Sequence, residues 1–201
     1  LRDSWNSARE ILRHRGYRYN VTIFSAMMFV FVGYIAVSAV LFKTIWNLPS
    51  DQIGWIQLQL GICWVTGSGL NFILLKRLSS RSLVLLGVGT TFSGFLLMGL
   101  SSLIWGNVVY ALVVPAAFIY LSITLVFSNT FVQCMDPFHQ NAGMASALTR
   151  FFQMTAGFLA GFLIGVLPEP DATNFILMGL VLSSVMMFCA VRSYQIQKPV
   201  D

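Results

Sequence analysis

Polar and small side chains recur at helical spacing inside long apolar stretches of this chain. In residues 54–75 they fall at steps of three or four, which places them on one face of a helix. They are Gln57, Gly61, Trp64, Ser68 and Asn71. Such a face can hydrogen-bond water or a small molecule in a cavity, or it can pack against another helix. For Gln57 and Asn71 both interpretations stay open.

Three further stretches, 19–42, 107–132 and 142–167, carry a comparable face. Its members are Met27, Phe31, Tyr34 and Ser38, then Tyr120, Thr124 and Phe127, then Arg150, Gln153, Gly157 and Gly161. The stretches 82–103 and 173–192 lack such a stripe and are expected on the outside. Polar residues within a membrane usually face the bundle interior, so we predict four helices around a central space. The predicted lining residues are Phe31, Tyr34, Gln57, Trp64, Asn71, Tyr120, Arg150 and Gln153.

One of these residues is charged. Arg150 follows the start of the stretch 142–167 by about two helical turns. An Arg at bilayer depth costs about 2.5 to 3.5 kcal/mol on insertion scales. Its side chain therefore extends to the cytoplasmic face, lines water, or pairs with an anionic group of a bound molecule or of an acid outside this chain.

Small residues form a second pattern in the stretch 142–167. Gly157, Gly161 and Gly165 recur every fourth residue, a spacing that suits close contact between helices. The start of the stretch is thin as well, which would let a neighbouring helix approach and slide. We predict a packing and gating role for Gly143, Ala145, Ser146, Gly157 and Gly161.

The chain shows no arrangement typical of an enzyme. Paired carboxylates for a metal and clusters of His with acids are missing from the sequence, and its three cysteines have no metal-like spacing. A channel would be expected to place polar rings at matching depths, and none is clear. We therefore expect no catalysis, no metal and no cofactor.

The apolar stretches themselves settle the class of the protein. With 57% hydrophobic and 9% charged residues, the chain is far less charged than soluble domains, which average about 25%. A bilayer interior of about 30 Å needs roughly 20 apolar residues in a helix. The predicted spans are 19–42, 54–75, 82–103, 107–132, 142–167 and 173–192. The sequence predicts an all-α integral membrane protein with six transmembrane helices.

Basic residues fall on one side of this bundle. They precede the first span, occupy the hinge 76–81 and follow the last span, whereas Lys43, Asp51, Glu169 and Asp171 lie on the other side. Basic residues near helix ends are retained in the cytoplasm, so both termini are expected there. The net charge of +5 describes a basic rim that contacts anionic membrane lipids, not a nucleic-acid site.

Three regions follow along the chain. Residues 1–17 read as an amphipathic cytoplasmic connector leading in from an upstream segment, with Trp5, Ala8, Ile11 and Leu12 on one face. Residues 18–193 form the transmembrane domain, and residues 194–201 form a cytoplasmic tail. The first three and last three spans show weak internal symmetry, as in three-plus-three inverted repeats of transporters.

The hinge after the fourth span carries a more specific pattern. Pro137, then Ala-Gly-Met-Ala-Ser-Ala-Leu at 142–148, then Phe152-Gln153 resembles the start of the eleventh helix in bicyclomycin-resistance type drug/proton antiporters of the major facilitator superfamily. Those proteins typically show Pro, Ala-Gly-Thr-Ala-Ser-Ala-Leu, then Phe-Gln or Leu-Gln. The basic hinge 76–81 and the spacing of all six spans extend the resemblance over nearly the whole chain.

The resemblance implies the C-terminal half of a twelve-helix transporter in a bacterial inner membrane. Alternating access would then export a small amphipathic, drug-like or metallophore-like compound, with an N-terminal six-helix half as partner and as carrier of the titratable acid. The aromatic and weakly polar walls suit such a ligand. The alternative is a six-helix scaffold or partner subunit that transports nothing itself.

Overall fold

The computed structural model describes residues 2–106, 108–166 and 172–196, and this part of the chain is all helical. The helices are α1 (Arg2–Arg13), α2 (Arg15–Thr44), α3 (Ser50–Leu74), α4 (Ser80–Trp105), α5 (Val109–Met135), α6 (Ala142–Val166) and α7 (Ala172–Ile196). A short 3-10 turn, η1 (His139–Asn141), precedes α6. Each predicted span coincides with one of the helices α2 to α7, most of which extend beyond the predicted ends. The end of the predicted tail, 197–201, lies outside the described residues.

Five segments are long and apolar enough to cross a membrane, so this is a multi-span helical membrane protein. They are α2, α4, α5, η1 with α6, and α7. The prediction of six apolar spans is thus confirmed for five. Helix α3 has 25 residues, a sufficient length, but with Asp51, Gln57, Gln59 and Asn71 it is not among the five segments that are apolar enough. These polar groups need partners or water if α3 lies at membrane depth.

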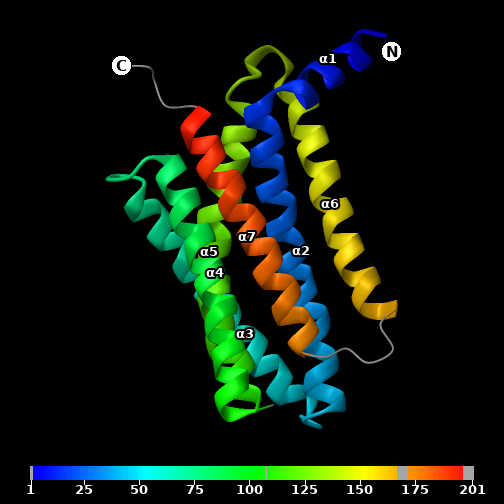
Figure 1. Ribbon diagram of the computed structural model, residues 1–201, viewed down its shortest axis with the longest axis vertical. Helices are drawn as coiled ribbons and strands as arrows, with labels where there is room; N and C mark the ends of the chain where they lie inside the picture. The colour runs from blue at the N-terminus through cyan, green and yellow to red at the C-terminus, as the bar shows by residue number, and fades with distance from the viewer. Residues whose placement is uncertain (1, 107, 167–171, 197–201) are drawn as a thin grey trace.

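Helices α2 to α7 run alternately up and down in one bundle (Figure 1). The start of α2, the α3–α4 hinge, the α5–α6 hinge and the end of α7 therefore lie at the same end, which we call the basic end. It carries Arg13, Arg15, Arg18, Lys76, Arg77, Arg81 and Arg192. Lys43 lies at the opposite end, and the predicted acids Glu169 and Asp171 lie outside the described residues.

Helix α1 lies at the basic end, against α2 and α6. Its Ile11 is buried with Tyr17, Val21, Cys134 and Ala145 in a small apolar cluster. The residues predicted to share a face with Ile11 do not join this cluster: Trp5 is 73% exposed and Leu12 is also exposed. One anchor residue thus ties the helix to the bundle, and the remaining apolar side chains are available to a membrane surface.

The main packing partners lie in different halves of the bundle. Helix α3 packs on α5, and α6 packs on α2. Helix α4 packs on α5, α7 packs on α2, and α4 and α7 also pack on each other. Exchanging α2, α3 and α4 for α5, α6 and α7 leaves this scheme unchanged. Within each triplet, the second helix packs only weakly on the first.

Glycines permit the closest of these approaches. A Cβ at Gly67 would overlap the backbone carbonyl of Leu121, and a Cβ at Gly179 would overlap the ring of Phe95. The first contact joins α3 to α5 and the second joins α7 to α4. Small residues serve this purpose in membranes because lipid supplies no hydrophobic force between helices, so close van der Waals contact must hold them.

Buried hydroxyl and amide groups add hydrogen bonds between the same helices. Thr91 on α4 and Ser122 on α5 lie 2.7 Å apart, oxygen to oxygen. Asn129 Nδ2 on α5 donates to Asn71 Oδ1 on α3 at 2.6 Å. Between α7 and α2, the Ser193 hydroxyl donates to Asn20 Oδ1 at 2.8 Å. Each bond is worth about 0.6 kcal/mol in comparable membrane bundles, and they fix which helix faces meet.

Replacing Gly67 by Ala should destabilise the bundle, because the α3 and α5 backbones must separate to admit the methyl group. Overpacking of this kind costs about 1–3 kcal/mol. Gly69→Ala is the matched control on the same helix, since nothing lies within 4 Å of its added Cβ. Thermal unfolding in detergent should show a lower midpoint for Gly67→Ala alone. Equal midpoints for the two variants would contradict the α3–α5 contact.

Candidate functional site

A cavity of about 430 Å³ opens among four helices of the bundle. Its lining comes from α2, α3, α5 and α6, and the residues are Phe24, Met28, Phe31, Trp64, Phe127, Ser128, Phe131, Arg150 and Gln153. These are the four helices predicted from the polar stripes. Neither α4 nor α7 contributes to the lining. The expectation that these two helices lie on the outside is wrong, because α4 and α7 pack on each other and on α5 and α2, and among the described residues they bury more side chains than α3 and α6 do.

Aromatic rings form most of the cavity wall. Phe31 and Trp64 pack edge to face with centroids 5.4 Å apart, which joins α2 to α3 across the cavity. Phe24 contacts Phe127 and Phe131 of α5, with centroids at 5.2 and 5.8 Å. Rings in such contacts have few conformations to lose on binding, and their faces can stack on a flat apolar ligand.

Arg150 brings a positive charge into this aromatic wall. Its guanidinium carbon lies 4.6 Å from the ring centre of Phe131 and 5.7 Å from that of Phe24, both within cation–π distance. Its Nη1 donates a hydrogen bond of 2.8 Å to Gln153 Oε1. The Gln153 amide nitrogen lies 3.8 Å from Met28 Sδ. The charged group is therefore held in a defined place at the cavity.

Of the eight predicted lining residues, four meet at this cavity: Phe31, Trp64, Arg150 and Gln153. The other four lie elsewhere. Tyr34 and Tyr120 are buried in the main core, with ring centroids 5.6 Å apart. Gln57 Nε2 donates to Ser38 Oγ at 3.3 Å, and Asn71 is bonded to Asn129. Gln57 and Asn71 thus hydrogen-bond side chains of neighbouring helices, outside the lining of this cavity.

Five lining residues were not among the eight predicted ones, although Phe127 belonged to the predicted face of 107–132: they are Phe24, Met28, Phe127, Ser128 and Phe131. A signal for them exists in the sequence. Phe24, Met28 and Phe31 are spaced by four and three residues, and Phe127 and Phe131 by four, so each group shares a helix face. Polar residues guided the prediction, and an apolar aromatic stripe cannot be told from core packing by spacing alone.

The predicted packing and gating residues differ in their surroundings. A Cβ at Gly157 would contact Met28 and Val32 of α2 at 3.4 Å, and Ala145 is fully buried beside α1. Gly143 and Gly161 have no atom within 4 Å of an added Cβ, and Ser146 is half-buried. Within the described part of the chain, the glycine stripe of α6 makes its close helix contact at Gly157.

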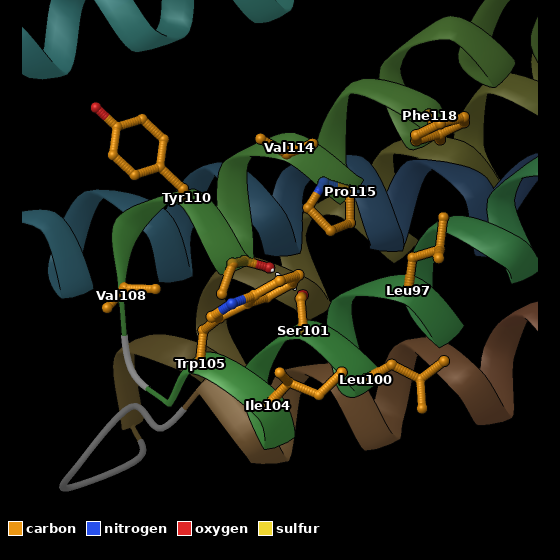
Figure 2. Close-up of a pocket in the computed structure, with 11 residues that line it drawn as sticks. Leu97, Leu100, Ser101, Ile104, Trp105, Val108, Tyr110, Val114, Pro115 and Phe118 are labelled. Carbon is orange, nitrogen blue, oxygen red and sulfur yellow. Dashed lines mark hydrogen bonds between the residues drawn. The ribbon is translucent and has the colours of Figure 1, made fainter.

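A second cavity, about 600 Å³, opens between α4 and α5 near the end opposite the basic end (Figure 2). Its lining is apolar except at Ser101, whose hydroxyl donates to the Ala111 carbonyl at 2.7 Å, and at the exposed Tyr110. Trp105 and Tyr110 stand at the helix ends, where aromatic residues gather at a membrane surface. We call this cavity the α4–α5 groove, and its composition suits contact with lipid chains.

Comparison of the chain with protein-family models, curated proteins and solved structures gave no match. The chemistry of the site therefore comes from its own residues. Among the described residues, no group of three His, Cys, Asp or Glu side chains could hold a metal ion. What the first cavity offers is an aromatic wall, one hydroxyl, one amide and one cation. We call it the Arg150 cavity.

Water should reach the Arg150 cavity. In a background with Cys63, Cys134 and Cys189 replaced by Ala, a cysteine in place of Ser128 should react with a charged methanethiosulfonate reagent, which does not dissolve in lipid. A cysteine in place of Ser122, which is fully buried, should stay unmodified. Mass spectrometry of the labelled protein measures both.

Two further variants make this labelling result interpretable. Ser184→Cys is exposed on α7 but lines none of the described cavities, so in lipid it should not react. His139→Cys at the basic end is the positive control, because it is exposed in a hinge. Reaction at position 139 without reaction at position 128 would mean that the cavity is dry.

Proposed function

We propose that this chain is the C-terminal six-helix half of a secondary active transporter of the major facilitator type. In this proposal alternating access exports a small amphipathic compound, and coupling to protons drives the export. The observation that carries the proposal is the Arg150 cavity, lined by α2, α3, α5 and α6 and by neither α4 nor α7. Substrate cavities of secondary transporters lie at such helix interfaces.

The packing scheme supports the proposal independently of the cavity. Helix pairs α3–α5 and α6–α2 correspond to each other when the two triplets are exchanged, and so do α4–α5 and α7–α2. Two inverted three-helix repeats would produce such a scheme. The second helix of each triplet, α3 or α6, lines the cavity and packs mainly on one neighbouring helix. Helices held by one neighbour are suited to move during alternating access.

Proton coupling requires a titratable group that becomes buried and exposed in turn. Of the acids whose side chains the structure places, Glu10 lies on α1, Asp51 in the first turn of α3 and Asp136 just after α5. None lines the Arg150 cavity. In our proposal the proton-carrying acid therefore belongs to an N-terminal six-helix half, and the substrate site is completed between the halves. The basic end then faces the cytoplasm and its anionic lipids.

Transport should depend on Trp64 and not on Trp105. Cells that express the native polypeptide and lack other efflux pumps should accumulate less of a fluorescent amphipathic dye than cells without it. Trp64→Ala should raise dye accumulation in these cells several-fold, because it removes the ring that joins α2 to α3 across the cavity. Trp105→Ala removes an exposed ring of the α4–α5 groove and should leave export unchanged.

Three measurements complete the test. Both variants must be present in the membrane in equal amount, and an uncoupler of the proton gradient should abolish the difference between expressing and non-expressing cells. The native polypeptide should be about twice the size of this chain, as six further helices would make it. A polypeptide of this size alone, with no dye exported, would favour the scaffold or partner subunit.

A further inference from the structure

The Arg150 guanidinium is a cation without an anionic partner in the described part of the chain. Its contacts there are the neutral Gln153 amide and two phenylalanine rings. We propose that the Arg150 cavity binds an anionic compound that carries an aromatic or other flat apolar group, and that Arg150 binds the anionic group. The inference rests on the proposed function, for which it names the substrate class.

The depth of the charge supports this assignment. Phe24 lies nine residues from the start of α2, and Phe131 lies four residues from the end of α5, which correspond to about 14 and 6 Å along the helices. Arg150 is exposed to the open side of the cavity, and its guanidinium lies at the level of both rings, not beyond the basic end of the bundle. A cation at such depth is costly unless an anion or water compensates it. An anionic ligand would supply that compensation and gain a strong interaction in return.

The orientation of Arg150 leaves donors for such a ligand. A guanidinium has five N–H donors in one plane, and the structure uses one of them, from Nη1 to Gln153. The two phenylalanine rings lie near the guanidinium carbon and accept no hydrogen bond from it, which leaves N–H groups on its edge without a partner. A carboxylate, sulfonate or phosphate group can accept two parallel hydrogen bonds from that edge. Gln153 and the rings thus act to hold the guanidinium in position.

The rest of the cavity fits the remainder of the ligand. Phe31, Trp64 and Phe127 offer ring surface, and Ser128 adds one hydroxyl. No acidic side chain is among the lining residues, so an anion meets no repulsion from them. A volume of about 430 Å³ falls in the range of small-molecule sites, roughly 300 to 1,000 Å³. A cationic compound of equal size would be opposed by Arg150.

The test measures equilibrium binding to the purified native polypeptide in lipid nanodiscs. Three probes share one ring system: 2-naphthoate is anionic, 2-naphthalenemethanol is neutral and 2-naphthylmethylammonium is cationic. We expect 2-naphthoate to bind about tenfold or more tightly than the alcohol, and the cation to bind weakest. Arg150→Gln should remove this tenfold preference and leave the affinity for the alcohol within about twofold.

Arg192→Gln is the matched control, because Arg192 also lies over a phenylalanine ring, Phe188 at 5.3 Å, but outside the cavity. It should leave all three affinities unchanged. Gln153→Glu offers a second route if Arg150→Gln does not fold. It places a carboxylate where Oε1 now accepts from Arg150, so it should occupy the guanidinium, weaken 2-naphthoate binding and leave the affinity for the alcohol within about twofold.

Equal affinities for the three probes, or a preference for 2-naphthoate that survives both Arg150→Gln and Gln153→Glu, would overturn the inference. Those results would leave the transport proposal intact if Trp64→Ala still abolished dye export. The opposite pair of results can also be told apart from this one. A preference for 2-naphthoate that depends on Arg150, without export of any dye, would support the anion site and contradict transport.

Discussion

The hydrocarbon interior of a membrane offers backbone N–H and C=O groups no hydrogen-bond partners, and this constraint acts on every level of the structure. Each long segment must satisfy its own backbone, so it forms a helix. Helices in lipid then gain little from burying apolar surface against one another. They depend instead on close contact, as at Gly67 and Gly179, and on buried pairs such as Asn71 with Asn129.

The same constraint explains why the cavity is where it is. Glycines bring α4 and α7 into close contact with their neighbours at Gly87, Gly94 and Gly179, whereas α6 packs extensively on α2 but has open space at Gly143, Gly161 and Gly165. Large rings on α2, α3 and α5 keep the backbones apart opposite Arg150. Space remains where bulky side chains meet and small ones are lacking. A cation can be kept in that space because aromatic faces and an amide partly replace water.

The sequence was a good guide to the helices and a partial guide to the site. Length and hydropathy predicted the spans within a few residues, because membrane thickness fixes both. The predicted polar faces lie on the four helices that line the Arg150 cavity, yet Tyr34 and Tyr120 are core residues and Phe24 and Phe131 are lining residues. Spacing defines a helix face but not its rotation relative to the next helix. That rotation follows from side-chain packing between α2 and α5, which a single sequence does not display.

The crossed packing of the two triplets has a consequence for synthesis. Helices α2, α3 and α4 leave the ribosome before α5, α6 and α7, and they make few contacts with one another; their main partners are these later helices. The first three helices must therefore wait in the bilayer, with Asn71 and Ser80 unpaired, until Asn129 and Gln133 of α5 are inserted. The insertion of α5 therefore allows the early helices to assemble. Each early helix packs on a later helix of the chain and not on the helix next to it in sequence.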